Sequence, residues 1–569
     1  MGGAERMEAQ LFMKPVATYQ KLRGGYYTPE PIAEFLARWA IQTPTTTVLE
    51  PSCGDGTLLE SAIETLLLHG AERTAIANLV HGIELEPDEA RKAAERIQAL
   101  TDLSNPVPIH VGDFFSYCQR YLFESREFDA VIGNPPFIRY QNFPEHHRGI
   151  AFYLMQQAGL HPSRLTNSWV PFLVAATLVL KRQHGRLAMV IPAELLQVNY
   201  AAELRHFLSQ HYSYITLITF KKLVFDGIQQ EVVLLLGERN GREHTGIRTI
   251  ELNGIDDLLA YEHTAFQSEK LKEMDHSTEK WTMYFLDEPE LQLLRELKTH
   301  PALTTAGKVI DVDVGIVTGF NDFFVLTEQQ VEQYELKPYT QRIVGRSAHL
   351  PGIHFSESDW MANAERQAPA FLFNPPDMPF YSLPGSLQAY ISDGEEKGLH
   401  KGYKCRIRNR WYVVPSVWTP PAFMLRQIHT YPKLILNDAN ATSTDTIHRV
   451  KLRNGTSARV VTSAFLNSLT FAFSEVIGRS YGGGVLELEP NEAEKLPIPL
   501  VGAEALDLDD LDRLLRLGNI ENCLDITDQK LLRNGLGLSA GDTARLRTIW
   551  QKLRDRRVNR KPDYATKRS

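Results

Sequence analysis

Long hydrophobic runs and cysteines are scarce in this chain of 569 residues. No apolar stretch reaches the roughly 18 residues that a membrane-spanning helix needs, and the longest, at residues 170–180, ends at Lys181 and Arg182. The four cysteines lie far apart, at positions 53, 118, 405 and 523, with no Cys-x-x-Cys pair. A disulfide framework and a structural metal site are therefore not expected.

An excess of positive charge is also missing. The 61 Lys and Arg residues are outnumbered by 69 Asp and Glu, so the net charge is −8. Such a chain is not coated with nucleic-acid-binding charge, although a local basic groove is compatible with it. The N-terminal segment has no apolar core typical of a signal peptide, which favours a cytoplasmic protein.

Predicted strands and helices alternate along the first part of the chain. The runs that predict strands occupy residues 46–50, 80–85, 109–112, 129–132 and 186–191. The helical spacings occupy residues 57–69, 86–100, 170–182 and 200–210. This alternation predicts an α/β fold with a largely parallel sheet. Strands at 215–220 and 231–236 have no helix between them, which predicts an antiparallel hairpin at a sheet edge.

The pattern changes near residue 245. Residues 241–350 mix helical and strand-like spacing, and residues 351–421 are rich in Pro, Gly and aromatics. Helical spacing returns at residues 506–557. Because the chain is too long for one hydrophobic core, we expect two domains, at residues 1–245 and 246–569.

A glycine-containing turn follows the first predicted strand, in the segment VLEPSCGDGTLLESAI. Gly54 and Gly56 allow the backbone to turn tightly and to approach a ligand, and the helix that follows offers free N–H groups. Two glycines do not make the GxGxxG fingerprint of dinucleotide-binding proteins.

Three acids, Glu50, Glu84 and Asp113, end three successive predicted strands. Ligands of open α/β sheets bind at these carboxyl ends, where a carboxylate suits two ribose hydroxyls or an adenine amino group. One such acid alone is more often a solvated loop residue, but three in succession predict a site for adenosine. An acid beside the glycine turn disfavours phosphate, so we expect a nucleoside rather than a nucleotide.

The tetrapeptide Asn134-Pro135-Pro136-Phe137 follows the fourth predicted strand, in FDAVIGNPPFIRY. The prolines remove two N–H donors and leave carbonyl acceptors, and Asn134 adds a side-chain carbonyl. A pair of acceptors suits an NH2 group, and Phe137 can stack on a planar base. A second Asn-Pro-Pro, at residues 374–376, is interpreted as an ordinary proline-rich turn.

The segments GGYYTPEPIAEFLARWA, VLEPSCGDGTLL, GIELEP, HVGDFF and VIGNPPF occur in that order. Together they resemble the gamma-class adenine-specific DNA methyltransferases of TaqI and Eco57I type, from bacterial restriction–modification systems. The resemblance covers about residues 20–240 and extends loosely to YKCRIRNRWY and YGGGVLELEPNEAEKLPIP, which look like parts of a target-recognition domain. It implies a Rossmann-like methyltransferase domain with a mostly parallel seven-stranded sheet, followed by a mixed α+β target-recognition domain.

The same resemblance implies that the cofactor is S-adenosylmethionine. The positions that match the family's cofactor-binding segments are Tyr27, Thr28, Pro29, Glu50, Cys53, Gly54, Glu84, Asp113, Phe114, Asn134 and Pro136. The residues Asn134, Pro135, Pro136 and Phe137 match the catalytic motif, whose last position is often Tyr. Phe137 and Phe225, the latter in KLVFDGIQQEVVLLL, match rings that stack on the extruded base.

A basic segment, KGYKCRIRNRW at residues 401–411, carries five basic residues and no acid. Its alternation fits a β-strand with one basic face, and we expect Lys404, Arg406, Arg408 and Arg410 to contact DNA. The alternative is a solvated edge strand. The basic tail at residues 551–569 is interpreted as a solubilising terminus, and the glycines at 482–484 as a hinge or a close approach to a DNA groove.

The preferred interpretation is adenine methylation in double-stranded DNA. RNA adenine, a protein glutamine, or cytosine are alternative substrates because each presents an NH2 group, and a catalytically silent DNA-binding homologue is a further alternative. About twenty residues precede the first motif, too few for a nuclease domain. Any restriction endonuclease partner is therefore expected to be separately encoded, with the enzyme itself in the bacterial cytoplasm on nucleoid DNA.

Overall fold

The computed structural model describes residues 27–101, 106–123, 127–222, 224–225, 231–239, 245–261, 270–275, 279–481 and 483–559. The basic tail beyond residue 559, Gly482 and residues 226–230, between the two strands of the predicted hairpin, lie outside the described residues. The chain divides into two compact units. Unit 1 is Met1–Tyr284 with Pro562–Ser569, and unit 2 is Phe285–Lys561.

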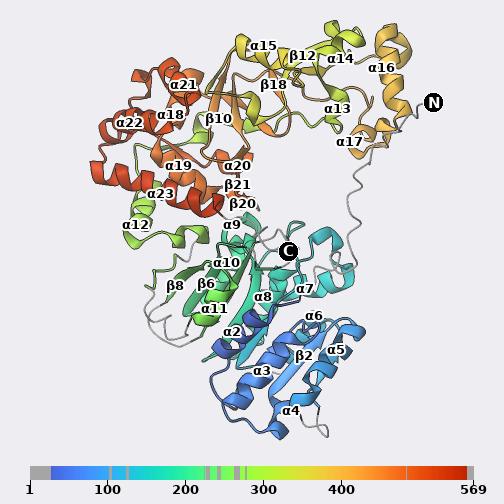
Figure 1. Cartoon of the computed structure of the whole chain (residues 1–569), viewed down its shortest axis with the longest axis vertical. Coiled ribbons are helices and arrows are strands. Elements are labelled where there is room, and N and C mark those ends of the chain that lie inside the picture. The colour runs from blue at the N-terminus through green and yellow to red at the C-terminus, as the bar shows by residue number, and fades with distance from the viewer. Residues whose placement is uncertain are drawn as a thin grey trace, which may run out of the picture. The chain divides into compact units, whose positions relative to one another are not determined.

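Unit 1 is built on a twisted sheet (Figure 1) whose described strands number eight, in the order β3-β2-β1-β4-β5-β7-β6-β8. These strands are β1 (Val48–Glu50), β2 (Val80–Glu84), β3 (Ile109–Val111), β4 (Ala130–Gly133), β5 (Arg186–Pro192), β6 (Tyr214–Phe220), β7 (Val232–Glu238) and β8 (Gly246–Leu252). Strands β1 to β5 run parallel, and only β7 is antiparallel to its two neighbours.

The predicted α/β fold with a mostly parallel sheet is confirmed, with two corrections. The sheet has eight described strands rather than seven. The antiparallel hairpin of β6 and β7 is present but does not lie at the edge, because β8 runs parallel to β6 along its whole length.

The helices of unit 1 cover a sheet whose central strands are buried on both faces. They are α2 (Glu30–Ala40), α3 (Thr57–Leu68), α4 (Ile76–Leu79), α5 (Pro87–Ile97), α6 (Phe114–Phe123), α7 (Glu145–Gln157), α8 (Trp169–Leu178), α9 (Glu194–Gln197), α10 (Ala202–His211) and α11 (Ile255–Ala260). Helix α2 packs against α3, β4 and β5, whereas α8 packs against α6, α7 and α10. In β5, Ala188 and Val190 join the core cluster that contains α2. The intervening Leu187 and Met189 point to the opposite face and are equally buried.

The division between the units falls later than the predicted boundary at 245/246. Strand β8 begins at Gly246 and pairs within the sheet of unit 1. The segment that follows also returns to this unit, because the Thr249 hydroxyl donates to the Tyr284 carbonyl at 2.9 Å and the Arg205 guanidinium to the Glu279 carbonyl at 3.0 Å. The amino-acid composition changes near residue 245, but the residues that follow still pack within unit 1.

Unit 2 is a mixed α+β structure with several small sheets and a helical end. Its two larger sheets have the orders β10-β19-β15-β17-β13 and β11-β14-β12-β18. The strands are β9 (Thr304–Thr305), β10 (Ile310–Asp313), β11 (Val325–Leu326), β12 (Thr340–Val344), β13 (His354–Phe355), β14 (Phe371–Phe373), β15 (Ala422–Leu425), β16 (Gln427–Ile428), β17 (Leu434–Asn437), β18 (Thr442–Ser443), β19 (Ile447–Leu452), β20 (Arg479–Tyr481), β21 (Val485–Glu487) and β22 (Pro497–Ile498).

The helices of unit 2 range from one-turn helices to α23, which has 19 residues. They are α12 (Glu288–Lys298), α13 (Asn321–Phe324), α14 (Glu328–Gln333), α15 (Glu357–Glu365), α16 (Gly385–Glu396), α17 (Tyr403–Arg406), α18 (Ala458–Phe465), α19 (Ser468–Ile477), α20 (Pro490–Ala493), α21 (Leu508–Arg516), α22 (Ile520–Thr527) and α23 (Ala540–Val558). Within the described ranges no single helix is long and apolar enough to span a membrane, although the bent pair α18 and α19 passes by length and composition.

Candidate functional site

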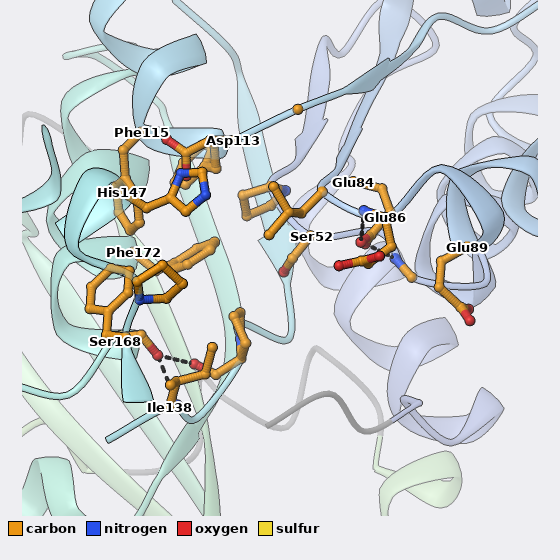
Figure 2. Close-up of a pocket in the computed structure, with 18 of the residues that line it drawn as sticks. Ser52, Glu84, Glu86, Glu89, Asp113, Phe115, Ile138, His147, Ser168 and Phe172 are labelled. Carbon is orange, nitrogen blue, oxygen red and sulfur yellow. Dashed lines mark hydrogen bonds and ion pairs between the residues drawn. The ribbon is translucent and has the colours of Figure 1, made fainter. Parts of the chain in front are cut away.

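A cavity of about 360 Å³ lies at the carboxyl ends of β1, β2, β3 and β4. Figure 2 shows the acids Glu84, Glu86 and Glu89 on one side of it and the rings of Phe115, His147 and Phe172 on the other. The predicted cofactor residues that line it are Tyr27, Gly54, Glu84, Asp113, Phe114, Asn134 and Pro136. One end of the cavity is therefore acidic and the other is aromatic.

The turn after β1 brings a backbone amide to the acidic side. Gly54 and Gly56 adopt positive φ values of 49° and 86°, which favour glycine. A Cβ on Gly56 would lie 2.8 Å from the Cα of Ala93, so helix α5 packs directly on the turn. Arg96 of the same helix pairs with Asp55 at 2.8 Å and holds the turn from outside.

Glu84 is held in place by the backbone on both carboxylate oxygens. Its Oε2 accepts the Gly54 N–H at 2.8 Å, and its Oε1 accepts the Glu86 N–H at 2.9 Å. Burial raises the pKa of Glu84, while these two amide bonds act in the opposite direction. Each oxygen has a further lone pair, so the carboxylate can also accept two hydroxyl groups from a ligand.

Two predicted cofactor residues, Glu50 and Cys53, lie behind the cavity wall rather than on it. Glu50 is 1% exposed, and its Oε2 has no hydrogen-bond donor among the described residues. Burial, followed by the nearby Glu84 carboxylate, raises the pKa of Glu50 well above its usual value. Burial likewise raises the pKa of the Cys53 thiol. Both side chains support the turn from within the core.

Asp113 begins helix α6 at the aromatic end of the cavity. Its Oδ1 accepts the Ser116 N–H at 2.9 Å and the Ser116 hydroxyl at 3.0 Å, which is an N-terminal capping arrangement. Its Oδ2 lies 3.1 Å from Nδ1 of His147, on helix α7. The rings of Phe114 and Phe172 stack with centroids 5.1 Å apart. The result is an apolar wall beside a fixed carboxylate.

Asn134 follows β4 and faces Thr28. Its Nδ2 donates to the Thr28 hydroxyl at 3.2 Å, and its backbone carbonyl accepts from the Ser52 hydroxyl at 3.3 Å. The predicted cofactor residue Thr28 is 8% exposed and therefore reaches the site through Asn134. The adjoining Pro29 begins helix α2, where it is half-buried and does not line the cavity.

Ser168, on the segment that precedes helix α8, binds the Asn-Pro-Pro-Phe tetrapeptide from the other side. Its hydroxyl donates to the Pro136 carbonyl and accepts the Ile138 N–H at 2.9 Å. Figure 2 shows both bonds beside Ile138. The sequence offers no local sign of this role, because serine is common before helices. His147 and Phe172 were also not expected, since each belongs to a helix remote from the motifs.

The two rings expected to stack on a base lie in a hydrophobic cluster rather than along the cavity. Phe225 is 7% exposed within this cluster, and Phe137 is half-buried against it. Val224 also packs there. Phe225 would have to leave the cluster before it could stack on a base, whereas Phe137 already has an accessible edge.

The predicted basic strand in unit 2 is wrong: residues 403–406 form the short helix α17. Its four candidate DNA contacts divide into two kinds. Arg408 donates to the carbonyls of Val317 and Thr318 at 2.9 and 2.7 Å, and burial lowers the pKa of its guanidinium. Arg410 pairs with Asp377. Lys404 and Arg406 remain exposed.

Two protein-family models match successive parts of this chain. The model described as "Eco57I restriction-modification methylase" matches residues 61–225, and that described as "Type II methyltransferase M.Eco57I, C-terminal domain" matches residues 278–532. The chain is 22% identical to the Type II methyltransferase M.AccI of Acinetobacter calcoaceticus over 492 residues, which cover 84% of this chain and 85% of the relative.

A second relative and a solved structure are of the same kind, a Type II methyltransferase and a restriction–modification enzyme. The Type II methyltransferase M.XamI of Xanthomonas campestris pv. amaranthicola is 22% identical over 508 residues, with 86% of this chain and 88% of the relative covered. The fold is similar to that of the Type IIL restriction-modification enzyme MmeI, solved in complex with DNA. The TM-score is 0.57 at 13% identity, with 92% of this chain and 75% of that chain covered. The two family models match successive parts of the chain, and together with these relatives they support a restriction–modification DNA methyltransferase.

Proposed function

We propose that this protein is a site-specific DNA methyltransferase that transfers a methyl group from S-adenosylmethionine to the exocyclic amino group of adenine in duplex DNA. One observation carries the proposal. The Asn134-Pro135-Pro136-Phe137 loop lies at the carboxyl end of β4, beside the cavity. The acidic end of this cavity suits the ribose of a nucleoside, and its aromatic end suits the base.

The donors and acceptors of the cavity suit this cofactor. The Glu84 carboxylate would accept the two ribose hydroxyls, and the free lone pair on Asp113 Oδ2 would accept from the adenine amino group. The paired rings of Phe114 and Phe172 offer an apolar wall for the base. S-Adenosylmethionine supplies, when bound, an electrophilic methyl group on a sulfonium. The acids that surround the turn disfavour a phosphate there.

The loop offers a pair of acceptors to an amino group. The backbone carbonyl of Asn134 already accepts from Ser52, and that of Pro136 from Ser168. No donor among the described residues reaches the Pro135 carbonyl, which would accept one N–H bond of the substrate, while the side-chain carbonyl of Asn134 would accept the other. These bonds favour a tetrahedral nitrogen with an available lone pair. Positioning then replaces a strong general base, since the nitrogen becomes acidic only after transfer.

The target adenine would leave the duplex to reach this loop, at a cost of roughly a few kcal/mol for unstacking. Stacking on Phe137 would return about 1–3 kcal/mol. The fold likeness to an enzyme solved in complex with DNA supports DNA as the substrate. An adenine in RNA or a protein glutamine would satisfy the same two acceptors, but the relatives named Type II methyltransferases favour DNA. We propose that any partner endonuclease is separately encoded.

The test exploits the two Asn-Pro-Pro sequences of the chain. Asn374 follows β14, in unit 2, a strand that is antiparallel to both of its neighbours. We expect Asn134→Ala to abolish methylation with cofactor affinity near normal, because the missing interaction acts in the transition state. Asn374→Ala should methylate as wild type does.

Base-resolution modification sequencing of a genome that expresses each variant gives the readout. Wild type should leave methylated adenine at one recurrent sequence. Methylcytosine, or no DNA modification at all, would overturn the assigned substrate. A residual rate of one tenth or more in Asn134→Ala would remove Asn134 from the catalytic role.

A further inference from the structure

Ser168 makes three hydrogen bonds to the residues on either side of Phe137. Its hydroxyl donates to the Pro136 carbonyl and accepts the Ile138 N–H at 2.9 Å, and its own N–H donates to the Ile138 carbonyl at 2.9 Å. The residue is 1% exposed and lines the cavity. A buried hydroxyl that has both a donor and an acceptor partner holds these partners in one arrangement.

We infer that Ser168 is a positioning residue, which determines which carbonyls of the catalytic loop face the substrate. The inference rests on the proposed function and goes beyond it, because it concerns a residue outside the motif. The loop has few ways to hold itself, since two prolines remove its own N–H donors. By engaging the Pro136 carbonyl, Ser168 turns that acceptor away, and the preceding Pro135 carbonyl is left for the amino group.

Ser168 is itself anchored by its neighbour in the chain. Asn167 Nδ2 donates to the Tyr200 hydroxyl at 3.1 Å and lies 3.4 Å from Glu194 Oε2. The Tyr200 hydroxyl also donates to Glu194, which follows β5 in the sheet. Loop residues after β4 are thus tied, through residues 167–168, to the end of the adjacent strand. A hydroxyl at position 168 connects these two strand ends.

The first test compares two buried hydroxyls associated with one helix. Ser168→Ala removes the two hydroxyl bonds to the loop and keeps the backbone bond to Ile138, whereas Thr177→Val removes a hydroxyl at the far end of α8 that bonds to Leu173 and Tyr212. We expect Ser168→Ala to lower kcat by about tenfold to a hundredfold at saturating DNA, as for a misplaced reacting group. The Kd for S-adenosylmethionine and the KM for DNA should stay near wild type. Thr177→Val should retain kcat. Equal kcat values in both variants, or a Ser168→Ala loss that appears only in KM, would overturn the inference.

The second test needs no substrate. Amide hydrogen exchange of the peptide that contains Ile138 should become faster in Ser168→Ala, because that N–H loses its acceptor, while peptides from β5 exchange as in wild type. Unchanged exchange at Ile138 would overturn the inference even if the rate fell. If wild-type protein does not methylate DNA, the proposed function fails, and the exchange result still decides whether Ser168 holds the loop.

Discussion

Glu50 and Glu84 are two buried acids whose carboxylate oxygens differ in their hydrogen-bond donors. Glu84 has a backbone donor on each oxygen, whereas Glu50 Oε2 has none among the described residues. Burial and the charge of Glu84 raise the pKa of Glu50 in the folded protein. The folded state therefore binds this proton more tightly than the unfolded state. The resulting stability is fully present below the unfolded pKa of about 4.3 and is lost as pH rises through the folded-state pKa.

We expect Glu50→Gln to remove this pH dependence. Gln keeps an oxygen that can accept the Leu59 N–H but has no proton to lose. The difference in apparent melting temperature between variant and wild type should therefore grow in favour of the variant between about pH 5 and pH 8. Thermal melts without cofactor at several pH values measure it. A constant difference over that range would contradict the raised pKa.

At the scale of elements, the turn between β1 and α3 uses its two glycines for different purposes. Gly56 has a positive φ and no room for a side chain beside Ala93, whereas a Cβ on Gly54 would meet nothing within 4 Å. Gly54 also lines the cavity and donates its N–H to Glu84. Gly56 therefore serves helix packing, and Gly54 lies at the cavity wall.

Substitution by alanine should separate these purposes. Gly56→Ala should cost more stability than the ~1–2 kcal/mol of left-handed backbone strain, because the methyl also collides with α5. Gly54→Ala should cost no more than that strain but weaken S-adenosylmethionine binding, since its methyl occupies open space at the cavity wall. Melting temperatures and calorimetric affinities of the two variants test the pair. Equal effects on stability would contradict the difference in packing.

The environment of the basic residues in and after helix α17 changes the prediction of which of them contact DNA. Lys404 and Arg406 are exposed and have no carboxylate partner in the described part of the chain, while Arg408 bonds to backbone carbonyls. We expect the double variant Lys404→Ala, Arg406→Ala to flatten the salt dependence of DNA binding, by about 0.9 in slope for each phosphate that is no longer neutralised. Arg408→Ala should lower the melting temperature and leave the slope unchanged. Salt titrations on duplex DNA would contradict this assignment if the double variant kept the wild-type slope.

Much of unit 1 could be predicted because its signals are local. A buried parallel strand is a continuous hydrophobic run, and β4 and β5 are read directly from such runs. The period of two at residues 404–410 was misleading, since a short helix and a turn place alternate basic residues in different environments. Ser168 and His147 could not be predicted, because their partners are distant in sequence and neither residue belongs to a motif.

At the scale of the whole molecule, the position of the division between the units has a direct consequence for truncated chains. A chain ending at residue 245 lacks β8 and would leave β6 as an unpaired edge. A chain ending at Tyr284 keeps the strand and its bonds to the following segment. We expect the longer chain to melt cooperatively and to gain melting temperature with S-adenosylmethionine, and the shorter one to aggregate. Equal stability of the two would contradict the later boundary.

All four cysteines are free and buried. They should react little with thiol reagents, so a cysteine introduced at the surface can be labelled selectively. Burial raises the pKa of each thiol, which keeps the reactive thiolate scarce. A maleimide dye should therefore react with the native surface only where a cysteine is introduced. Leu68 in unit 1 and Leu517 in unit 2 are 76% and 68% exposed, and cysteines there would carry a fluorescent donor and acceptor. Energy transfer between them would follow the separation of the two units as DNA is added.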